Sequence, residues 1–171
     1  MDQGLDLITG LPWPDSDDEY IRQAAEAQLL ARGFAREEVA VSPWTLLTHQ
    51  GQPLRVHADL LVSLAGRPAL VITCRRGSLV SREKETIAEA RLLFPTWVPL
   101  AAVFNGDEGE LLDTASGKVL ASGPAALPHR EELAALVRER PPHSPTPAET
   151  CQAARVYHAF YFIQCPGVCC V

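Results

Sequence analysis

Positive charge is scarce in this chain of 171 residues, which carries 15 Lys and Arg against 21 Asp and Glu. Residues 1–20 account for the whole formal net charge of −6, because that segment has six acidic residues and no Lys or Arg. A protein that binds nucleic acid mainly through electrostatics needs a broad basic face. The composition therefore excludes a strongly basic nucleic-acid binder and leaves only a local patch for contact with DNA.

Long apolar runs are also missing, since the longest are strand-sized and interrupted. We therefore expect no transmembrane helix and no membrane partner. The N-terminal residues lack a basic segment followed by an apolar one, so we expect no signal peptide. Five cysteines without a secretion signal indicate reduced thiols, and this predicts a cytoplasmic location.

Several motifs that carry chemistry are absent. The chain has no G-x-S-x-G turn of a serine hydrolase and no glycine-rich loop of the P-loop or dinucleotide type. Trp13, Trp44 and Trp97 are too far apart in the sequence to predict a platform for base stacking, and we interpret them as core or interface anchors.

The residues that are present suit one domain with a sizeable core, since 47% are hydrophobic. We expect an acidic extended lead-in over 1–16, an α/β domain over 17–127, and a helical extension over 128–171 with a proline-rich linker and a cysteine-rich tail. Apolar periodicity and turn residues predict helices at 17–32, 81–94, 128–140 and 148–164, and strands at 39–47, 98–104 and 110–118. A loop is expected at 48–53. This order indicates a mixed central sheet flanked by helices.

The central feature is a predicted β-hairpin over 57–77, with its turn at 65–68. If the hairpin closes near Gly66, Asp59 lies opposite Thr73. Side chains alternate along a strand, so His57, Asp59, Thr73 and Arg75 would then share one face. Cys74 would point to the opposite face, where we expect it to pack in the core.

The order of these segments resembles the PD-(D/E)xK nuclease superfamily, and more narrowly the N-terminal nuclease domain of type I restriction enzyme R subunits. The resemblance covers about residues 17–120. It depends on Glu19-Tyr20-Ile21-Arg22-Gln23, on Ala58-Asp59-Leu60-Leu61-Val62, on Val71-Ile72-Thr73-Cys74-Arg75-Arg76-Gly77 and on Val103-Phe104-Asn105-Gly106. It implies a restriction-endonuclease-like fold, DNA as the partner, and Mg²⁺-dependent cleavage in members that keep the full motif.

This chain departs from that pattern at the residues that carry the chemistry. Family members that cut DNA have Glu at the position of Thr73 and Lys at the position of Arg75, and Ser42 stands where a further acid is often found. Threonine is a neutral ligand, and arginine stays protonated and cannot serve as a base. Only Asp59 remains as a weak Mg²⁺ ligand. The resemblance therefore implies a degenerate nuclease site that requires no cofactor, whereas an active one would need Mg²⁺.

Three interpretations remain open for this face. Asp59 and Arg75 would form a cross-strand ion pair in a degenerate domain, whose DNA contacts would come from His57, Arg75, Arg76, Arg82 and Lys84. An active endonuclease would instead need a carboxylate from elsewhere, for instance Glu19 or Glu26 of the first helix. A third interpretation is a protein-interaction module that uses the acidic lead-in and the cysteine-rich tail.

The tail contains a second candidate site. Cys165, Cys169 and Cys170 lie close together in the sequence, and Cys151 and His158 are seven residues apart on the preceding helix. Thiolates and imidazoles bind Zn²⁺, although this spacing is not that of a common zinc knuckle. The alternative is a cluster of buried or redox-labile thiols.

Overall fold

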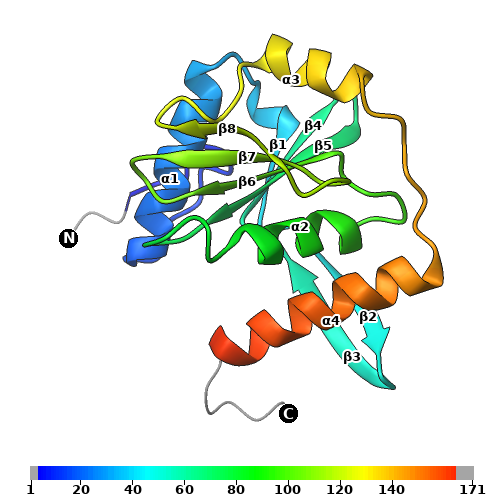
Figure 1. The fold of residues 1–171 in the computed structure, drawn as a ribbon. Coiled ribbons are helices and arrows are strands. Elements are labelled where there is room, and N and C mark those ends of the chain that lie inside the picture. The colour runs from blue at the N-terminus through cyan, green and yellow to red at the C-terminus, as the bar shows by residue number, and fades with distance from the viewer. Residues whose placement is uncertain (1–3, 165–171) are drawn as a thin grey trace.

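The computed structural model describes residues 4–164 and places a six-stranded mixed sheet between helices (Figure 1). The strand order is β1-β4-β5-β6-β7-β8, and a separate two-stranded ribbon is formed by β2 and β3. The expected fold class is therefore confirmed, including the C-terminal helical extension. The elements are α1 (Asp17–Ala31), the 3₁₀ turn η1 (Arg36–Glu38), β1 (Val39–Val41), β2 (Trp44–His49), β3 (Gln52–His57), β4 (Leu60–Leu64), β5 (Arg67–Cys74), α2 (Glu83–Leu92), β6 (Leu100–Phe104), β7 (Gly109–Asp113), β8 (Val119–Gly123), α3 (Arg130–Arg138) and α4 (Pro147–Gln164).

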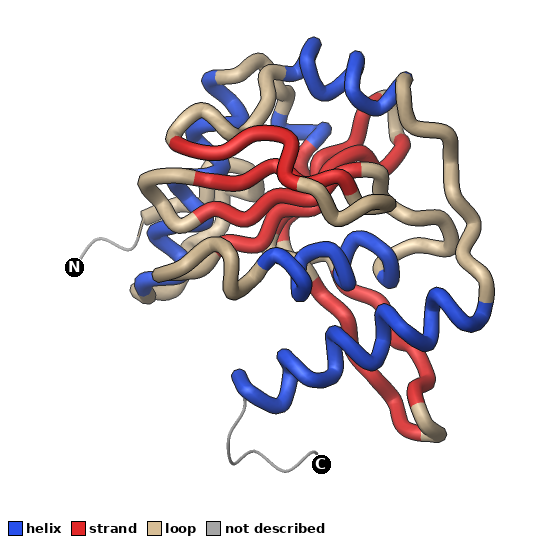
Figure 2. Tube along the Cα trace, viewed as in Figure 1, coloured by secondary structure: helices blue, strands red, loops and turns tan. Residues whose placement is uncertain are grey.

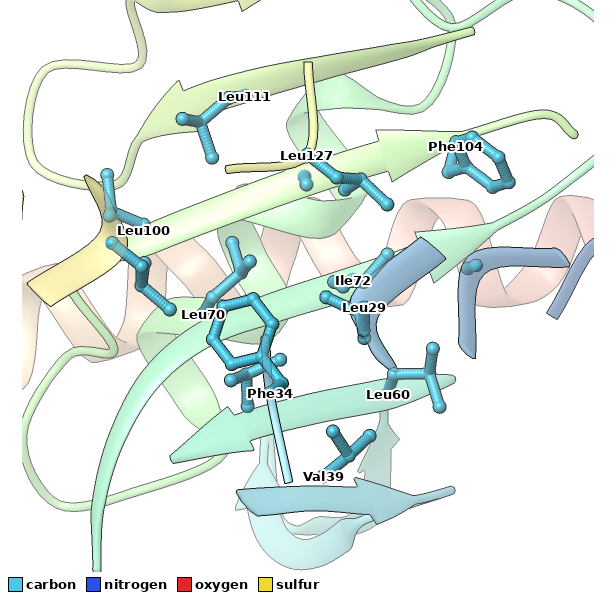
Figure 3. Packing of buried hydrophobic residues seen from close by; sticks show 14 of the residues in the cluster. Leu29, Phe34, Val39, Leu60, Leu70, Ile72, Leu100, Phe104, Leu111 and Leu127 are labelled. Atoms are coloured by element: carbon cyan, nitrogen blue, oxygen red, sulfur yellow. The ribbon is translucent and has the colours of Figure 1, made fainter. Parts of the chain in front are cut away.

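Each face of the sheet has its own core. On one face, α1 and α3 cover β4, β5 and β6, with Leu29, Leu70 and Phe104 fully buried (Figure 3). On the other face, α2 packs against β5 and β6, and α4 packs on α2 and on the ribbon (Figure 2). Only β5 and β6 are parallel, and α2 makes the crossover between them, as a parallel pair requires. Both strands are buried on both faces, which explains their continuous apolar sequences.

The predicted first strand proves to be two short strands in different sheets. Ser42 has a positive φ of 51° and precedes Pro43, so the chain bends between β1 and β2. The expected loop at 48–53 is instead the tip of the ribbon, where Gln50 and Gly51 both have positive φ and form a two-residue turn. Pro53 is tolerated in β3 because a two-stranded ribbon leaves the outer edge of each strand unpaired. The turn lies within the predicted loop, but the loop was predicted too long, because the polar residues and the proline that flank the turn belong to the strands.

The central hairpin is shorter than predicted. It consists of β4 and β5, whereas His57 ends β3 and Asp59 lies between the two strands β3 and β4. The pairs Leu60↔Ile72 and Leu61↔Val71 extend to Asp59 opposite Thr73, the expected register. It arises from a β-bulge between Val62 and Ser63, because the pairs next to the turn, Leu64↔Arg67 and Ser63↔Pro68, are offset by one residue. Cys74 points to the α1 face and is 1% exposed, which confirms its packing role.

The turn of this hairpin contains an unfavourable residue. Ala65 and Gly66 have φ of 50° and 74°, the left-handed values of a type I′ turn. Glycine adopts this conformation without strain, but alanine does not. We expect Ala65→Asn to raise the free energy of unfolding by about 0.5–1 kcal/mol, since asparagine tolerates positive φ. Urea unfolding followed by circular dichroism measures the change, and Ala65→Val, which is β-branched, should do the reverse.

Two further segments differ from expectation. The strand predicted at 110–118 is β7, and β8 follows it as an edge strand whose first four side chains are exposed, so that no apolar alternation marks it. Residues 4–13 are not extended. They form a closed loop on α1, in which Asp6 N donates to Leu11 O (2.8 Å) and Leu5 bridges Pro12. Asp6 is 4% exposed and accepts a hydrogen bond from Arg22 (2.8 Å), so part of the acidic segment is internal structure.

Candidate functional site

The candidate site lies where β5 ends, and Asp59 is its central residue. Asp59 Oδ2 accepts hydrogen bonds from Arg75 Nη1 (2.6 Å) and from the backbone amide of Cys74 (2.7 Å). The side chains of Arg75 and Asp59 are 14% and 17% exposed. The expected ion pair between the strands is therefore present, and it is largely shielded from water.

The charge of Arg75 is fixed by this pairing. Burial alone would lower the pKa of Arg75, but the charge of Asp59 and its hydrogen bond raise that pKa above the ordinary value. The same guanidinium nitrogen also donates to the carbonyl of Cys74 (2.7 Å). Arg75 therefore orients the Asp59 carboxylate and has no capacity to act as a general base.

Thr73 faces α2, where it joins a chain of buried polar groups. Its Oγ1 lies 2.8 Å from Glu89 Oε2 and 2.7 Å from Thr86 Oγ1, and Thr86 Oγ1 lies 3.1 Å from the carbonyl of Arg82. Each hydroxyl has one proton to donate. All three contacts become hydrogen bonds when Glu89 is protonated and donates to Thr73, which then donates to Thr86. With an ionised Glu89, only two of the three contacts have a proton.

The environment of Glu89 favours its neutral form. Burial raises its pKa well above the ordinary value, and the nearby charges of Asp59 and Glu85 raise it further. Glu89 is 1% exposed and Glu85 is 3% exposed. The sequence analysis missed this residue. Its only sequence signal is the spacing of four between Glu85 and Glu89, which puts two acids on one helix face with Thr86 beside it.

His57 lies at the end of β3, beside the site, and is bound by α4. The Tyr157 hydroxyl lies 3.0 Å from His57 Nδ1 and accepts a hydrogen bond from the backbone amide of His57 (3.3 Å). Burial lowers the pKa of His57, and burial also raises the pKa of Tyr157, which is 2% exposed. Sequence reasoning also missed Tyr157, because it lies 100 positions from His57.

The basic residues proposed for DNA contact do not form one free patch. Arg76 pairs with Asp17 of α1, and Arg82 pairs with Glu85 (3.0 Å). With Arg75 bound to Asp59 and His57 bound to Tyr157, four of the five proposed residues have partners within the protein. Lys84 is exposed.

Two acids of α1, Glu19 and Glu26, are paired with Arg22. Glu19 and Asp6 both pair with Arg22, and Arg22 Nη1 lies 2.8 Å from Glu26 Oε1. Burial raises the pKa of Glu26 to about 7, although the charge of Arg22 opposes this shift. Within residues 4–164, neither Glu19 nor Glu26 makes a hydrogen bond to Asp59. Both predicted substitute carboxylates are therefore compensated by a cation of the protein itself.

The predicted zinc ligands Cys165, Cys169 and Cys170 lie outside the described residues. Cys151 is exposed, and the His158 ring lies 5.5 Å from the ring of His49. No group of three or more His, Cys, Asp or Glu side chains in the described part of the chain is arranged to hold a metal ion.

The residues around Asp59 do not fit the Mg²⁺ that the resemblance implies. Mg²⁺ binds ionised carboxylates and water in octahedral geometry. Here Asp59 is paired with Arg75 and Glu85 with Arg82, Thr73 is neutral, and burial favours the neutral form of Glu89. The Asp59 carboxylate is bound to the Arg75 guanidinium, and both are largely shielded from water. These groups leave little uncompensated negative charge to bind a divalent cation.

Among the described residues, no helix is long and apolar enough to span a membrane. No family model matches the chain, and neither a curated protein nor a solved structure matches it.

Proposed function

We propose that this chain is a catalytically silent relative of the N-terminal nuclease domain of type I restriction R subunits. In this proposal it takes part in a DNA-linked assembly through protein contacts and does not cut DNA. The observation that carries the proposal is the Asp59–Arg75 ion pair. Where a nuclease of this type needs a carboxylate free for a cation, this protein binds that carboxylate with its own guanidinium at 2.6 Å.

Two features support the nuclease-like part of the proposal. A helix precedes the sheet. The register of Leu60↔Ile72, extended by one residue, places Asp59 opposite Thr73, as the acid and the acid-x-Lys motif of such nucleases would require. Arg75 then follows β5 at the position of the family's lysine. The scaffold is therefore compatible with the resemblance, while the polar groups it carries are neutralised within the protein.

The competing proposal of an active endonuclease has weaker support. It requires a carboxylate from α1, and Arg22 holds both Glu19 and Glu26. Glu89 is closer to the site, but its raised pKa and its hydrogen bond from α2 to Thr73 favour the neutral acid.

We expect purified protein to leave supercoiled plasmid DNA intact in Mg²⁺ or Mn²⁺, because Asp59 is bound by Arg75 and the substitute acids Glu19 and Glu26 are bound by Arg22. Agarose gel electrophoresis measures nicking and linearisation over time. Asp59→Ala is the matched control, since any contaminating nuclease would act equally in both samples. Cleavage by the wild-type protein that is lost in Asp59→Ala would disprove the proposal.

We also expect the domain by itself to bind duplex DNA weakly. Each phosphate contact by a free cation releases about one counterion, so the slope of log K against log salt counts those contacts. With the neighbours of Lys84 paired, retardation in a gel-shift titration should occur only at low salt, with a slope of about −1. A slope of about −4 or steeper would show that the ion pairs open on DNA, and the site would then be a DNA-binding surface.

A further inference from the structure

Two exposed apolar patches of opposite charge lie on different parts of the molecule, and we propose that they bind each other between copies of this chain. The ribbon patch consists of Trp44, Leu46 and Arg55. The N-terminal patch consists of Leu5, Leu11, Asp15, Asp18 and Tyr20. The proposal is independent of the nuclease-like function, because neither patch includes Asp59, Thr73, Arg75 or Glu89.

The ribbon patch is the outer face of the β2–β3 ribbon. Leu46 pairs with Arg55 across the strands, and Trp44 lies two residues before Leu46 on the same face. Trp44 and Leu46 are 58% and 61% exposed, whereas the opposite face buries Leu54 and Val56 in the core. The Arg55 guanidinium lies 4.7 Å from the centroid of the Trp44 ring. Tryptophan and arginine are the residues that most often dominate the binding free energy of protein interfaces.

The N-terminal patch is formed by the closed loop on α1. Leu5 and Leu11 are 61% and 65% exposed, and they are adjacent because Leu5 bridges Pro12. Tyr20 is 56% exposed, and its ring packs edge to face against Trp13 with 4.8 Å between centroids. The Tyr20 hydroxyl is hydrogen-bonded to Asp15, which raises the pKa of the phenol. Exposed Asp15 and Asp18 give this patch a negative edge.

The two patches complement each other in charge and in apolar character. Arg55 makes no ion pair within residues 4–164, and over the same residues Asp15 and Asp18 make none with a Lys or Arg. An interface between the patches would join an aromatic and aliphatic surface on each side and would place a cation beside two carboxylates. A second copy of the chain is therefore an occupant that supplies both the apolar area and the missing counter-charge.

The two patches cannot satisfy each other within one molecule. In Figure 1 the N-terminal loop and α1 lie at the left of the sheet, whereas the ribbon projects at the lower right. Contact between copies therefore joins unlike patches, and it either closes into a two-fold dimer in which both contacts form or continues head-to-tail with one patch free at each end. The expected result is reversible association that increases with protein concentration.

Sedimentation velocity of the full chain tests the proposal with two complementary variants. Trp44→Ala removes the ribbon anchor, and Asp15→Lys/Asp18→Lys reverses the acidic edge. Both changes are at exposed positions, and circular dichroism checks that the variants fold. Each variant alone should associate about thirtyfold more weakly than the wild type, as for loss of an interface hot spot. Gln52→Ala, at an exposed position outside the patch, should associate as the wild type does.

The mixture of the two variants gives the sharpest result. Trp44→Ala keeps an intact N-terminal patch, and the charge-reversed variant keeps an intact ribbon, so an equimolar mixture should form one-to-one dimers that grow no further. High salt should weaken the wild-type association, because the contact is partly ionic. Wild type that stays monomeric from micromolar to millimolar concentration overturns the proposal, as do variants that associate normally alone or a mixture that stays monomeric.

Discussion

Arg75→Ala is expected to lower the free energy of unfolding by about 2–4 kcal/mol, a large part of the total stability of such a domain. The variant leaves the Asp59 carboxylate shielded from water without its cation, and the backbone amide of Cys74 remains as its hydrogen-bond donor. About a sixth of each side chain stays exposed, so the loss should fall below the largest values seen for fully buried pairs. Urea unfolding followed by circular dichroism and fluorescence measures the change.

A double-mutant cycle identifies the source of that loss. Asp59→Asn keeps an acceptor for the Cys74 amide but removes the charge, so Arg75→Ala should cost about 1–3 kcal/mol less in the Asp59→Asn background than in the wild type. The neighbouring Arg76 is the matched control, because its pair with Asp17 is 68% exposed on both sides. Arg76→Ala should leave the unfolding midpoint unchanged. Equal losses for Arg75→Ala and Arg76→Ala would contradict the central role given to the Asp59–Arg75 pair.

The part of the site that could be predicted from the sequence is the part fixed by strand alternation. The two-residue turn at Ala65-Gly66 and a β-bulge between Val62 and Ser63 together determine which residues of β4 and β5 are opposite each other. The turn alone would place Asp59 opposite Ile72, and the bulge shifts the register so that Asp59 lies against the end of β5. The pairing of Asp59 with Arg75 then follows from charge, and the inward direction of Cys74 follows from the alternation. These inferences use only neighbours within about fifteen residues of the turn.

The other members of the site depend on packing between distant elements. Glu89 looks like an ordinary surface acid on a mixed helix, and its burial is decided by how α2 lies across β5. Tyr157 reaches His57 only because α4 packs on α2 and the ribbon, after a proline-rich linker whose path has no sequence signature. The N-terminal acids look like one solvated segment, yet Asp6 is buried by a pairing with Arg22 that no local pattern shows.

Glu89→Gln is expected to change how stability depends on pH. The pKa of Glu89 is raised in the folded protein above its ordinary value of 4.5, so the folded state holds this proton more tightly than the unfolded state does. The stabilisation is complete below pH 4.5 and is lost as pH rises towards the raised pKa. Over that window the wild type should lose about 1.4 kcal/mol per pH unit from this group alone. Glutamine carries no such proton, and its amide donates to Thr73 as the neutral acid does.

The comparison that tests this is the difference in free energy of unfolding between Glu89→Gln and the wild type, measured by urea unfolding from about pH 5 to about pH 9. Stability of the variant relative to the wild type should rise with pH throughout the range in which Glu89 stays neutral. Glu26→Gln is the matched control, since the pKa of Glu26 is raised only to about 7 and its contribution should stop changing above that pH. A difference that does not vary with pH would mean that Glu89 is ionised in the folded protein. The site would then hold a second carboxylate beside Asp59, and the case for a silent nuclease relative would weaken with it.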